Sequence, residues 1–244
     1  MPGLIHPLLV VVPALNEQAS VGRVVTEIRE AVPDAVCLVV DDGSTDMTAV
    51  VARAAGARVL ALPFNLGVGG AMRAGFRFAR ENDYPVVVQV DADGQHDPRD
   101  IAELLIGLDS ADIVIGSRFA GTGDYAARGP RKWAMRVLAL AVSLVAGQRL
   151  PDVTSGFKAT GPRAVALFAH TYPAEYLGDT VEALVIAARA GLRIRPVPIA
   201  MRERQAGLPS QHPVRATVYL MRAGIAFLLA LMRPRVRVPK GETR

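Results

Sequence analysis

The sequence predicts an α/β fold in which a mostly parallel central sheet is covered by helices on both faces. Short, almost continuously apolar segments alternate with segments of helical length over the first half of the chain. Apolar residues make up 51% of the 244 residues and aromatic residues only 5%, so we expect an aliphatic core. Continuous apolar strands that alternate with helices are typical of parallel sheets buried on both faces. The length suits one large domain, or a domain with an appendage.

The first half of the chain is expected to alternate strand and helix up to about residue 117. The strands are expected at 8–12, 36–40, 57–61, 86–90 and 112–116, and the helices at 20–32, 46–55, 70–81 and 98–108. Asp46 and the pair Asp97-Pro98 are expected to begin the second and fourth helices, and Gly56 to end the second. After residue 117 the alternation breaks down into loops, two unusually apolar helices and one late strand at 192–199.

Charge and cysteine content narrow the class of protein. The net charge is +5, and basic residues are concentrated from Arg189 onward, which favours an anionic membrane surface as a partner. The aromatic platforms and basic stripe expected of a nucleic-acid-binding protein are missing from the first half, so no nucleic acid is expected. The single cysteine, Cys37, lies in an apolar run and is expected to be buried, which excludes a disulfide framework. The apolar run at 8–12 is too short for a signal peptide, so a cytoplasmic location is expected.

The two apolar helices at 133–147 and 214–232 raise the question of a membrane. Arg215, Arg222 and Arg233 fall on one helical stripe, and an arginine inside hydrocarbon is costly. Lying in the membrane interface is therefore favoured over spanning it, with Trp133 as an interfacial anchor, although a buried core helix stays open. We expect a catalytic domain at 1–212, an amphipathic helix at 213–233 and a basic tail at 234–244.

Acidic residues gather where three expected strands end. Asp91 and Asp93 flank one small residue, Ala92, and Gln95 adds a neutral oxygen. The carboxyl ends of parallel strands form the ligand-binding edge of such sheets. Mg²⁺ or Mn²⁺ prefers oxygen ligands, and Mg²⁺ typically takes one or two carboxylates together with substrate phosphates. Asp97 is better explained as a helix cap.

The loops after the first two strands carry further acids. Asp42 follows Asp41 at the end of the second strand, where a carboxylate can accept hydrogen bonds from a nucleobase or ribose. Glu17, after the first strand, has the same potential or is a solvated acid of the first helical turn. The glycine-rich segment 64–76 matches neither a Walker A motif nor a dinucleotide-binding motif, so its glycines support ligand approach or close packing only.

Six motifs of this sequence resemble, in type and in order, those of family-two GT-A glycosyltransferases, most closely the polyprenyl-phosphate (dolichyl-phosphate) mannose and glucose synthases. The resemblance runs from about residue 7 to 210 and rests on PALNE, DDGSTD, NLGVGGA, DADGQHDP, GSRF and DVTSGFKA. It implies a GT-A fold, a nucleoside diphosphate sugar as donor (GDP-mannose or UDP-glucose type), a polyprenyl or dolichyl phosphate as acceptor, and Mg²⁺ or Mn²⁺ as cofactor. The arginine stripe and the basic tail add the expectation of a peripheral location on the cytoplasmic face of the membrane.

The resemblance assigns roles to individual residues. It implies that Asp91, Asp93 and Gln95 surround the metal, and that Arg118 and Arg131 approach the acceptor phosphate with Ser155. Donor binding is implied for Pro13, Leu15, Glu17, Asp42, Asn65, Gly69, Asp91, Ala92 and Arg204, and a catalytic role for Asp93, Arg118 and Arg131. The segment 202–210 departs from the family pattern, because Pro209 and Ser210 stand where a serine-lysine pair is usual, so one lysine contact is missing.

Alternative functions differ in what they require of the sequence. Transfer to a glycan or small-molecule hydroxyl would need a catalytic base, and Asp152, Asp179 and Glu182 are the candidates. Asp179 and Glu182 also fit a helix-capping pattern. A nucleotidyltransferase is disfavoured because its basic, glycine-rich N-terminal loop is absent. A non-catalytic nucleotide-sugar-binding subunit stays open, as does recruitment by a separate membrane protein.

Overall fold

The structure is a computed structural model. It describes residues 7–117, 130–173, 179–202, 224–225, 227–234, 236 and 238; within these ranges, side chains 130–134 and 179 are not described.

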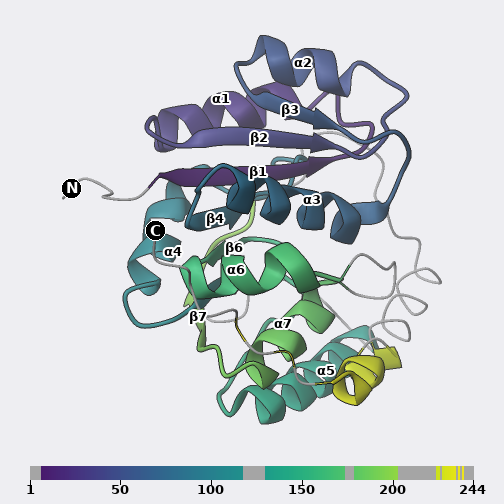
Figure 1. The fold of residues 1–244 in the computed structure, drawn as a ribbon, viewed down its shortest axis with the longest axis vertical. Coiled ribbons are helices and arrows are strands. Elements are labelled where there is room, and N and C mark those ends of the chain that lie inside the picture. The colour runs from purple at the N-terminus through teal and green to yellow at the C-terminus, as the bar shows by residue number, and fades with distance from the viewer. Residues whose placement is uncertain are drawn as a thin grey trace.

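A seven-stranded sheet in the described part of the chain has the order β3-β2-β1-β4-β6-β5-β7 (Figure 1). The strands are β1 (Leu8–Ala14), β2 (Val36–Asp41), β3 (Arg58–Ala61), β4 (Val86–Gln89), β5 (Ile113–Ser117), β6 (Lys158–Thr160) and β7 (Ile194–Pro198). β6 runs antiparallel to β4 and β5, and every other pair is parallel. The sheet is therefore mostly parallel, as predicted, and β1, β2 and β4 bring their carboxyl ends to one edge.

Helices cover both faces of the sheet, because each face carries its own apolar cluster. On one face α1 (Val21–Ala31), α2 (Thr48–Ala54) and α4 (Ile101–Gly107) pack on the strands. On the other face lie α3 (Gly67–Glu81), α5 (Pro130–Ala146), α6 (Pro162–Thr171) and α7 (Asp179–Arg189). The buried side chains are mainly valine, leucine, isoleucine and alanine, and Cys37 is buried among them.

The first half of the chain follows the predicted alternation, and the second half adds elements that were not predicted. The side chain of Asp46 accepts the Thr48 N–H at 2.9 Å, and that of Asp97 accepts the Arg99 N–H at 3.0 Å, so both act at helix starts as expected. Helix 98–108 is split into a 3₁₀ turn at Pro98–Asp100 followed by α4. β6 and α6 were missed, although the Gly161-Pro162 pair at the start of α6 is a recognisable helix-start signal. The capping pattern of Asp179 and Glu182 coincides with the start of α7.

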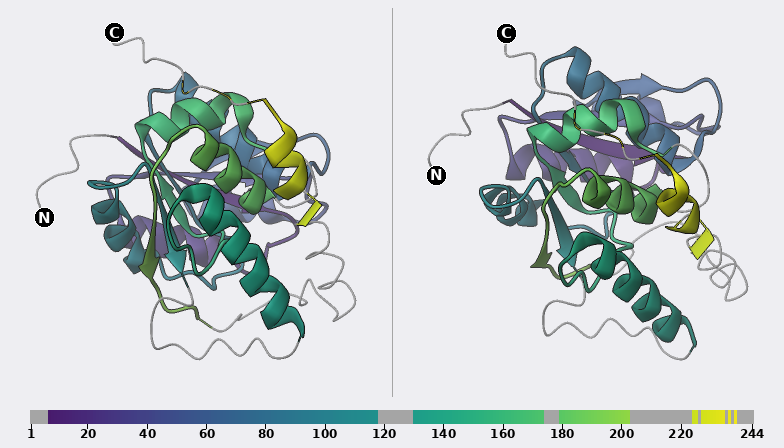
Figure 2. Two further views of the ribbon diagram at one scale, coloured as in Figure 1. Left: turned by 90° about the horizontal axis from the view of Figure 1, so that it is seen from below. Right: turned by 60° about the horizontal axis from the view of Figure 1, so that its bottom comes forward.

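The C-terminal helix, described at 224–225 and 227–232, lies beside α7 (Figure 2). Ala230 is buried in the core and Phe227 packs against it, whereas Ile225, Leu228 and Met232 are exposed. One side of this part of the helix therefore packs against the domain, and its exposed side is apolar as well. No helix in the described ranges is long and apolar enough to cross a membrane. The side chain of Trp133, and Arg215 and Arg222, lie outside the described residues.

Candidate functional site

The loops that follow β1 and β2 are bound to each other by side-chain hydrogen bonds. Asn16, with φ of 55°, accepts the Thr45 N–H through its side-chain oxygen at 2.9 Å, and its own N–H donates to Ser44 Oγ at 2.9 Å. The Glu17 N–H donates to Thr48 Oγ1 at 2.8 Å, and Ser20 Oγ donates to the Glu17 carboxylate at 2.6 Å. Polar side chains from PALNE and DDGSTD therefore form one continuous rim at the sheet edge.

Gly43 brings a third segment to this rim. It has φ of 77°, and a Cβ there would lie 2.8 Å from the backbone carbon of Phe64 and 2.9 Å from the Asn65 nitrogen. The backbone at 43 and at 64–65 can approach this closely only because residue 43 has no side chain. The predicted donor residue Asn65 is thereby placed next to the DDGSTD loop, and its side-chain oxygen accepts the Gly67 N–H at 2.8 Å.

Asp42, which directly follows β2, is buried and its side chain contacts the start of α3. Its Oδ1 accepts the Leu66 N–H at 2.7 Å, and its own N–H donates to the Ala14 oxygen at 2.9 Å. Burial raises the pKa of Asp42, the hydrogen bonds from Leu66 and Gly67 oppose that rise, and neighbouring Asp41 adds to it. The carboxylate predicted to face the nucleoside thus also holds α3 against the β2 loop.

Asp91 lies at the end of β4 with a half-exposed carboxylate. Its Oδ1 accepts a hydrogen bond from Gln89 Nε2 at 3.3 Å, and its N–H donates to His96 Nδ1 at 3.2 Å. The other nitrogen of the buried His96 ring lies 3.8 Å from Asp91 Oδ2. The imidazole therefore fixes the backbone of Asp91 and flanks its carboxylate.

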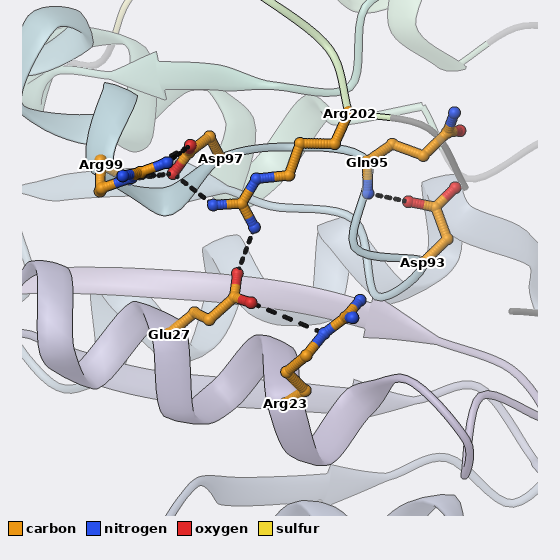
Figure 3. A network of polar contacts seen from close by, with 7 residues as sticks. All are labelled: Arg23, Glu27, Asp93, Gln95, Asp97, Arg99 and Arg202. Carbon is orange, nitrogen blue, oxygen red and sulfur yellow. Dashed lines mark hydrogen bonds and ion pairs between the residues drawn. The ribbon is translucent and has the colours of Figure 1, made fainter. Parts of the chain in front are cut away.

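Asp93 shapes the turn that carries the acids. Its Oδ1 accepts the Gln95 N–H at 3.0 Å, which closes the DADGQ segment into a compact loop. The side chains of Asp93 and Gln95 extend away from the neighbouring arginine network (Figure 3). Among the described residues there is no cluster of three or more histidine, cysteine, aspartate or glutamate side chains that could hold a metal alone. A pair of carboxylates fits a cation that shares its coordination with phosphate oxygens.

The segment 155–157 packs directly behind Asp91. A Cβ on Gly156 would lie 2.7 Å from Asp91 Oδ2 and 2.8 Å from Oδ1, so only glycine lets the backbone approach this carboxylate. Phe157 stacks on His96 with ring centroids 4.9 Å apart. Ser155 is buried, and its Oγ accepts the Phe157 N–H at 3.3 Å. The structure thus brings the predicted acceptor segment to the predicted metal ligand.

Arg202 joins the acidic loop to α1 (Figure 3). Its guanidinium lies 2.5 Å from Glu27 Oε2 and 2.8 Å from Asp97 Oδ1, and the backbone N–H of Arg202 donates to the Gln95 backbone oxygen at 2.9 Å. Arg99 also pairs with Asp97, at 2.6 Å. Paired first with Arg99 and then with Arg202, Asp97 has a pKa well below its usual range. The chain is therefore fixed to the site immediately before residue 203.

A buried lysine next to this edge was not identified from the sequence. Lys158 of β6 pairs in register with Gln89 of β4, and its Nζ lies 3.0 Å from the Tyr172 hydroxyl. Gln89 Oε1 and, on β5, Ser117 Oγ are buried without a hydrogen-bond partner among the described residues. A lysine in a short strand between apolar residues gives a weak signal, because charged side chains are rarely fully buried.

Several predicted residues complete this account. Pro13 is partly exposed and Leu15 exposed beside the PALNE turn, while Gly69 and Ala92 are buried in α3 and the DADGQ loop. Arg118 and Arg204, and the side chains of Arg131 and Asp179, lie outside the described residues. The other candidate bases are engaged. Asp152 Oδ1 accepts the Thr154 N–H at 3.1 Å, and Glu182 pairs with Arg233 at 3.0 Å.

Comparison with known sequences identifies similar proteins. A sequence model described as glycosyl transferase family 2 matches residues 9–165. An undecaprenyl-phosphate mannosyltransferase of Micrococcus luteus is 37% identical over 82% of this chain and 85% of its own length. A polyprenol monophosphomannose synthase of Mycolicibacterium smegmatis is 32% identical over 65% of this chain and 64% of its own length.

Solved structures agree on the fold. Glucosyl-3-phosphoglycerate synthase of Mycobacterium tuberculosis, crystallised with phosphoglyceric acid, superposes with a TM-score of 0.72, at 22% identity over 94% of this chain and 81% of its own. The same enzyme has been crystallised with Mn²⁺, uridine diphosphate and glucosyl-3-phosphoglycerate, and that structure superposes with a TM-score of 0.70, at 21% identity over 94% of this chain and 81% of its own. At this identity the likeness concerns the fold, which is the predicted GT-A arrangement.

Proposed function

The chain belongs to glycosyltransferase family 2, and from that premise we propose that it transfers a hexose from a nucleoside diphosphate sugar to polyprenyl phosphate. The observation that carries this proposal is the half-exposed carboxylate of Asp91, held by Gln89, His96 and Gly156 at the edge where three loops meet. The two relatives above 30% identity described here are named for mannosyl transfer, so a mannosyl donor is the first to test.

Asp91 and Asp93, with Gln95, are the residues that would hold a divalent cation with the donor diphosphate. A cation bound there would neutralise charge on the leaving diphosphate. The residues fit this role because Asp91 accepts its only close side-chain hydrogen bond from an amide and has no arginine or lysine partner among the described residues. A carboxylate without a cationic partner in a half-buried loop gains from a bound cation.

The class of acceptor is inferred from the contacts of the candidate base residues in the described part of the chain. A hydroxyl acceptor needs a general base, but Asp152 is occupied in its own turn and Glu182 is paired with Arg233. A phosphate monoester needs no such base, because its second pKa of about 6 leaves it largely dianionic at neutral pH. The engaged state of Asp152 and Glu182, two of the three candidate bases, therefore favours a lipid phosphate as nucleophile.

The proposed reaction is a single displacement with inversion. An oxygen of the lipid phosphate forms a bond to the anomeric carbon, and the bond from that carbon to the diphosphate breaks, so the nucleoside diphosphate leaves with the electron pair. Positioning is then the main task of the protein. Arg118 and Arg131 are assigned to the acceptor phosphate, because guanidinium groups are permanently charged and bind phosphate in a bidentate manner. Arg204 is assigned to the donor phosphates.

Access to a lipid acceptor is proposed to come from two helices that expose apolar side chains at the cytoplasmic face of the membrane. On α5, Val137, Leu140 and Leu144 are exposed at helical spacing, and on the C-terminal helix Ile225, Leu228, Leu229 and Met232 are exposed in the same way. Basic residues follow directly in the tail, which favours anionic lipid as the surface that contacts these exposed apolar side chains.

The proposal is tested by incubating the full chain with Mg²⁺ or Mn²⁺, polyprenyl phosphate and either GDP-mannose or UDP-glucose, and measuring sugar in the organic-extractable lipid. Product from one donor that disappears with EDTA is the expected result. Asp93→Ala should abolish it, while Asp109→Ala, which removes an exposed carboxylate after α4, should not. Metal-dependent turnover by Asp93→Ala at the parent rate would refute the metal assignment. Failure of both donors, with nucleotide still bound, would move the hydroxyl-acceptor and sensor alternatives ahead.

A further inference from the structure

A cationic cavity lies on the α3 face of the sheet, and the proposed reaction gives its basic residues no role. It has a volume of about 280 Å³ and is lined by α3, α6, α7 and the C-terminal helix. Arg73, Arg189 and Arg233 line it together with His170. We call this set of four residues the arginine pocket.

Two arginines of this pocket, Arg73 and Arg189, contact carbonyl groups within the described part of the chain. Arg73 Nη2 donates to the His170 oxygen at 3.4 Å, and Arg189 Nη1 donates to the oxygens of Ala230 and Leu231. These are carbonyl groups at the ends of helices, and neither Arg73 nor Arg189 has a carboxylate partner in the described part of the chain. Arg233 pairs with the buried carboxylate of Glu182.

Charge and donor geometry together favour a specific class of ligand. Each guanidinium carries five N–H donors, and the carbonyl contacts of Arg73 and Arg189 use one nitrogen of each. Arg73, Arg189 and Arg233 converge from three separate elements on one cavity, and Glu182, which pairs with Arg233, is not part of its lining, so the positive charges repel one another. An anion with several acceptor oxygens relieves that repulsion and takes bidentate hydrogen bonds.

We propose that the arginine pocket binds a phosphate group. The phosphate is either a free anion or the headgroup of an anionic lipid, because the exposed apolar side of the C-terminal helix begins beside the pocket, at Leu231 and Met232. A phosphate held by Arg73, Arg189 and Arg233 bridges α3, α7 and the C-terminal segment. Its binding therefore fastens the C-terminal helix to the domain, independently of the sugar-transfer reaction.

The first test measures phosphate binding to the full chain by calorimetry, with sodium chloride at matched ionic strength as the reference. The titration is repeated with saturating nucleoside diphosphate, so that phosphate sites of the donor loops are occupied. Arg73→Gln should weaken binding about tenfold, the usual size of one lost charge-assisted hydrogen bond. Arg77→Gln is the matched control, because Arg77 is exposed one turn further along α3 and does not line the pocket.

A second arm separates the two sources of phosphate. Vesicles of phosphatidylcholine with and without phosphatidylglycerol are sedimented with each variant at low salt. Loss of the phosphatidylglycerol-dependent fraction in Arg73→Gln but not Arg77→Gln identifies a lipid headgroup, whereas loss confined to calorimetry identifies free phosphate. If Arg73→Gln equals Arg77→Gln in both arms, or the parent binds neither probe, the proposal is wrong.

Hydrogen exchange measured on the unmodified parent tests the proposal without depending on whether a variant folds. Phosphate should slow amide exchange at 169–173 and 227–233, the segments that the bound anion would join. Unchanged exchange at both segments, at a phosphate concentration that saturates the calorimetric signal, would place the bound anion elsewhere and overturn the assignment.

Discussion

Replacing Gly156 by alanine should impair the metal-dependent reaction much more than it impairs folding. The added Cβ would lie 2.7 Å and 2.8 Å from the two carboxylate oxygens of Asp91, so the Asp91 side chain or the backbone at 155–157 must move. Overpacking of this kind costs about 1–3 kcal/mol. Loss of a flexible glycine in the unfolded chain offsets about 0.4–1 kcal/mol, because the φ of Gly156 is not positive and alanine can adopt the backbone.

The effect on activity follows from the position of Asp91. Displacing a positioned group by about 1 Å can cost about 100-fold in rate, so kcat should fall about 10- to 100-fold while the chain stays folded. The assays are lipid-linked sugar formation and the Mn²⁺ dependence of nucleoside diphosphate binding, which does not require turnover. Gly161→Ala is the control, since Gly161 lies at the other end of β6 and its Cβ would meet no atom closer than 3.3 Å. Parent-like metal dependence and kcat in Gly156→Ala would refute the inference that this glycine holds Asp91 in place.

Three further predictions concern groups whose surroundings are well defined. The hydrogen bond from Arg99 and the charge of Arg202 lower the pKa of Asp97 in the folded state. The contribution of Asp97 to stability is therefore present above the unfolded pKa of about 3.9 and is lost as the pH falls towards the folded pKa. Asp97→Asn should flatten the dependence of the free energy of unfolding on pH below pH 5, as measured by urea melts. Burial raises the pKa of Cys37 to about 12, so a thiol reagent at pH 8 should modify it only after denaturant is added. Asn16→Ala should lose about 1–2 kcal/mol in the same melts and Asn16→Gly less, because only glycine relieves the positive φ; equal losses would mean that φ is unimportant.

The first half of the fold could be predicted because each of its elements carries its own signal. The strands up to residue 117 are apolar runs, and the helix starts at Asp46 and Asp97 are set by side chains that accept hydrogen bonds two residues further on. Such signals depend on neighbours in the chain and not on the rest of the fold. The acidic residues of the three loops could be assigned to one sheet edge for the same reason, since parallel strands share their carboxyl ends.

The missed features depend on partners far apart in the sequence. β6 has three residues and exists because β4 and β5 pair with it on both sides, so its own sequence carries no alternation to recognise. The close approach of Gly156 to Asp91 and the bridge from Arg202 to Glu27 likewise join distant segments. The sequence around Gly156 indicates only a loop. The folded backbone is needed to show that the Asp91 carboxylate lies where a side chain of residue 156 would be.

The aspartates of the DADGQHD loop differ in their ion-pair partners, and this difference predicts different effects of replacing them by asparagine. Asp97 is paired with two arginines, whereas Asp91 has no arginine or lysine partner among the described residues. In EDTA, Asp91→Asn should cost less than about 1 kcal/mol of stability, because an amide oxygen can still accept from Gln89, whereas Asp97→Asn should cost at least about 1.5 kcal/mol through its charge-assisted bonds. With metal and nucleoside diphosphate added, the parent should gain stability that Asp91→Asn does not. If Asp91→Asn destabilises the metal-free protein as much as Asp97→Asn does, Asp91 is a structural carboxylate, and the case for a cation at this edge loses its main physical support.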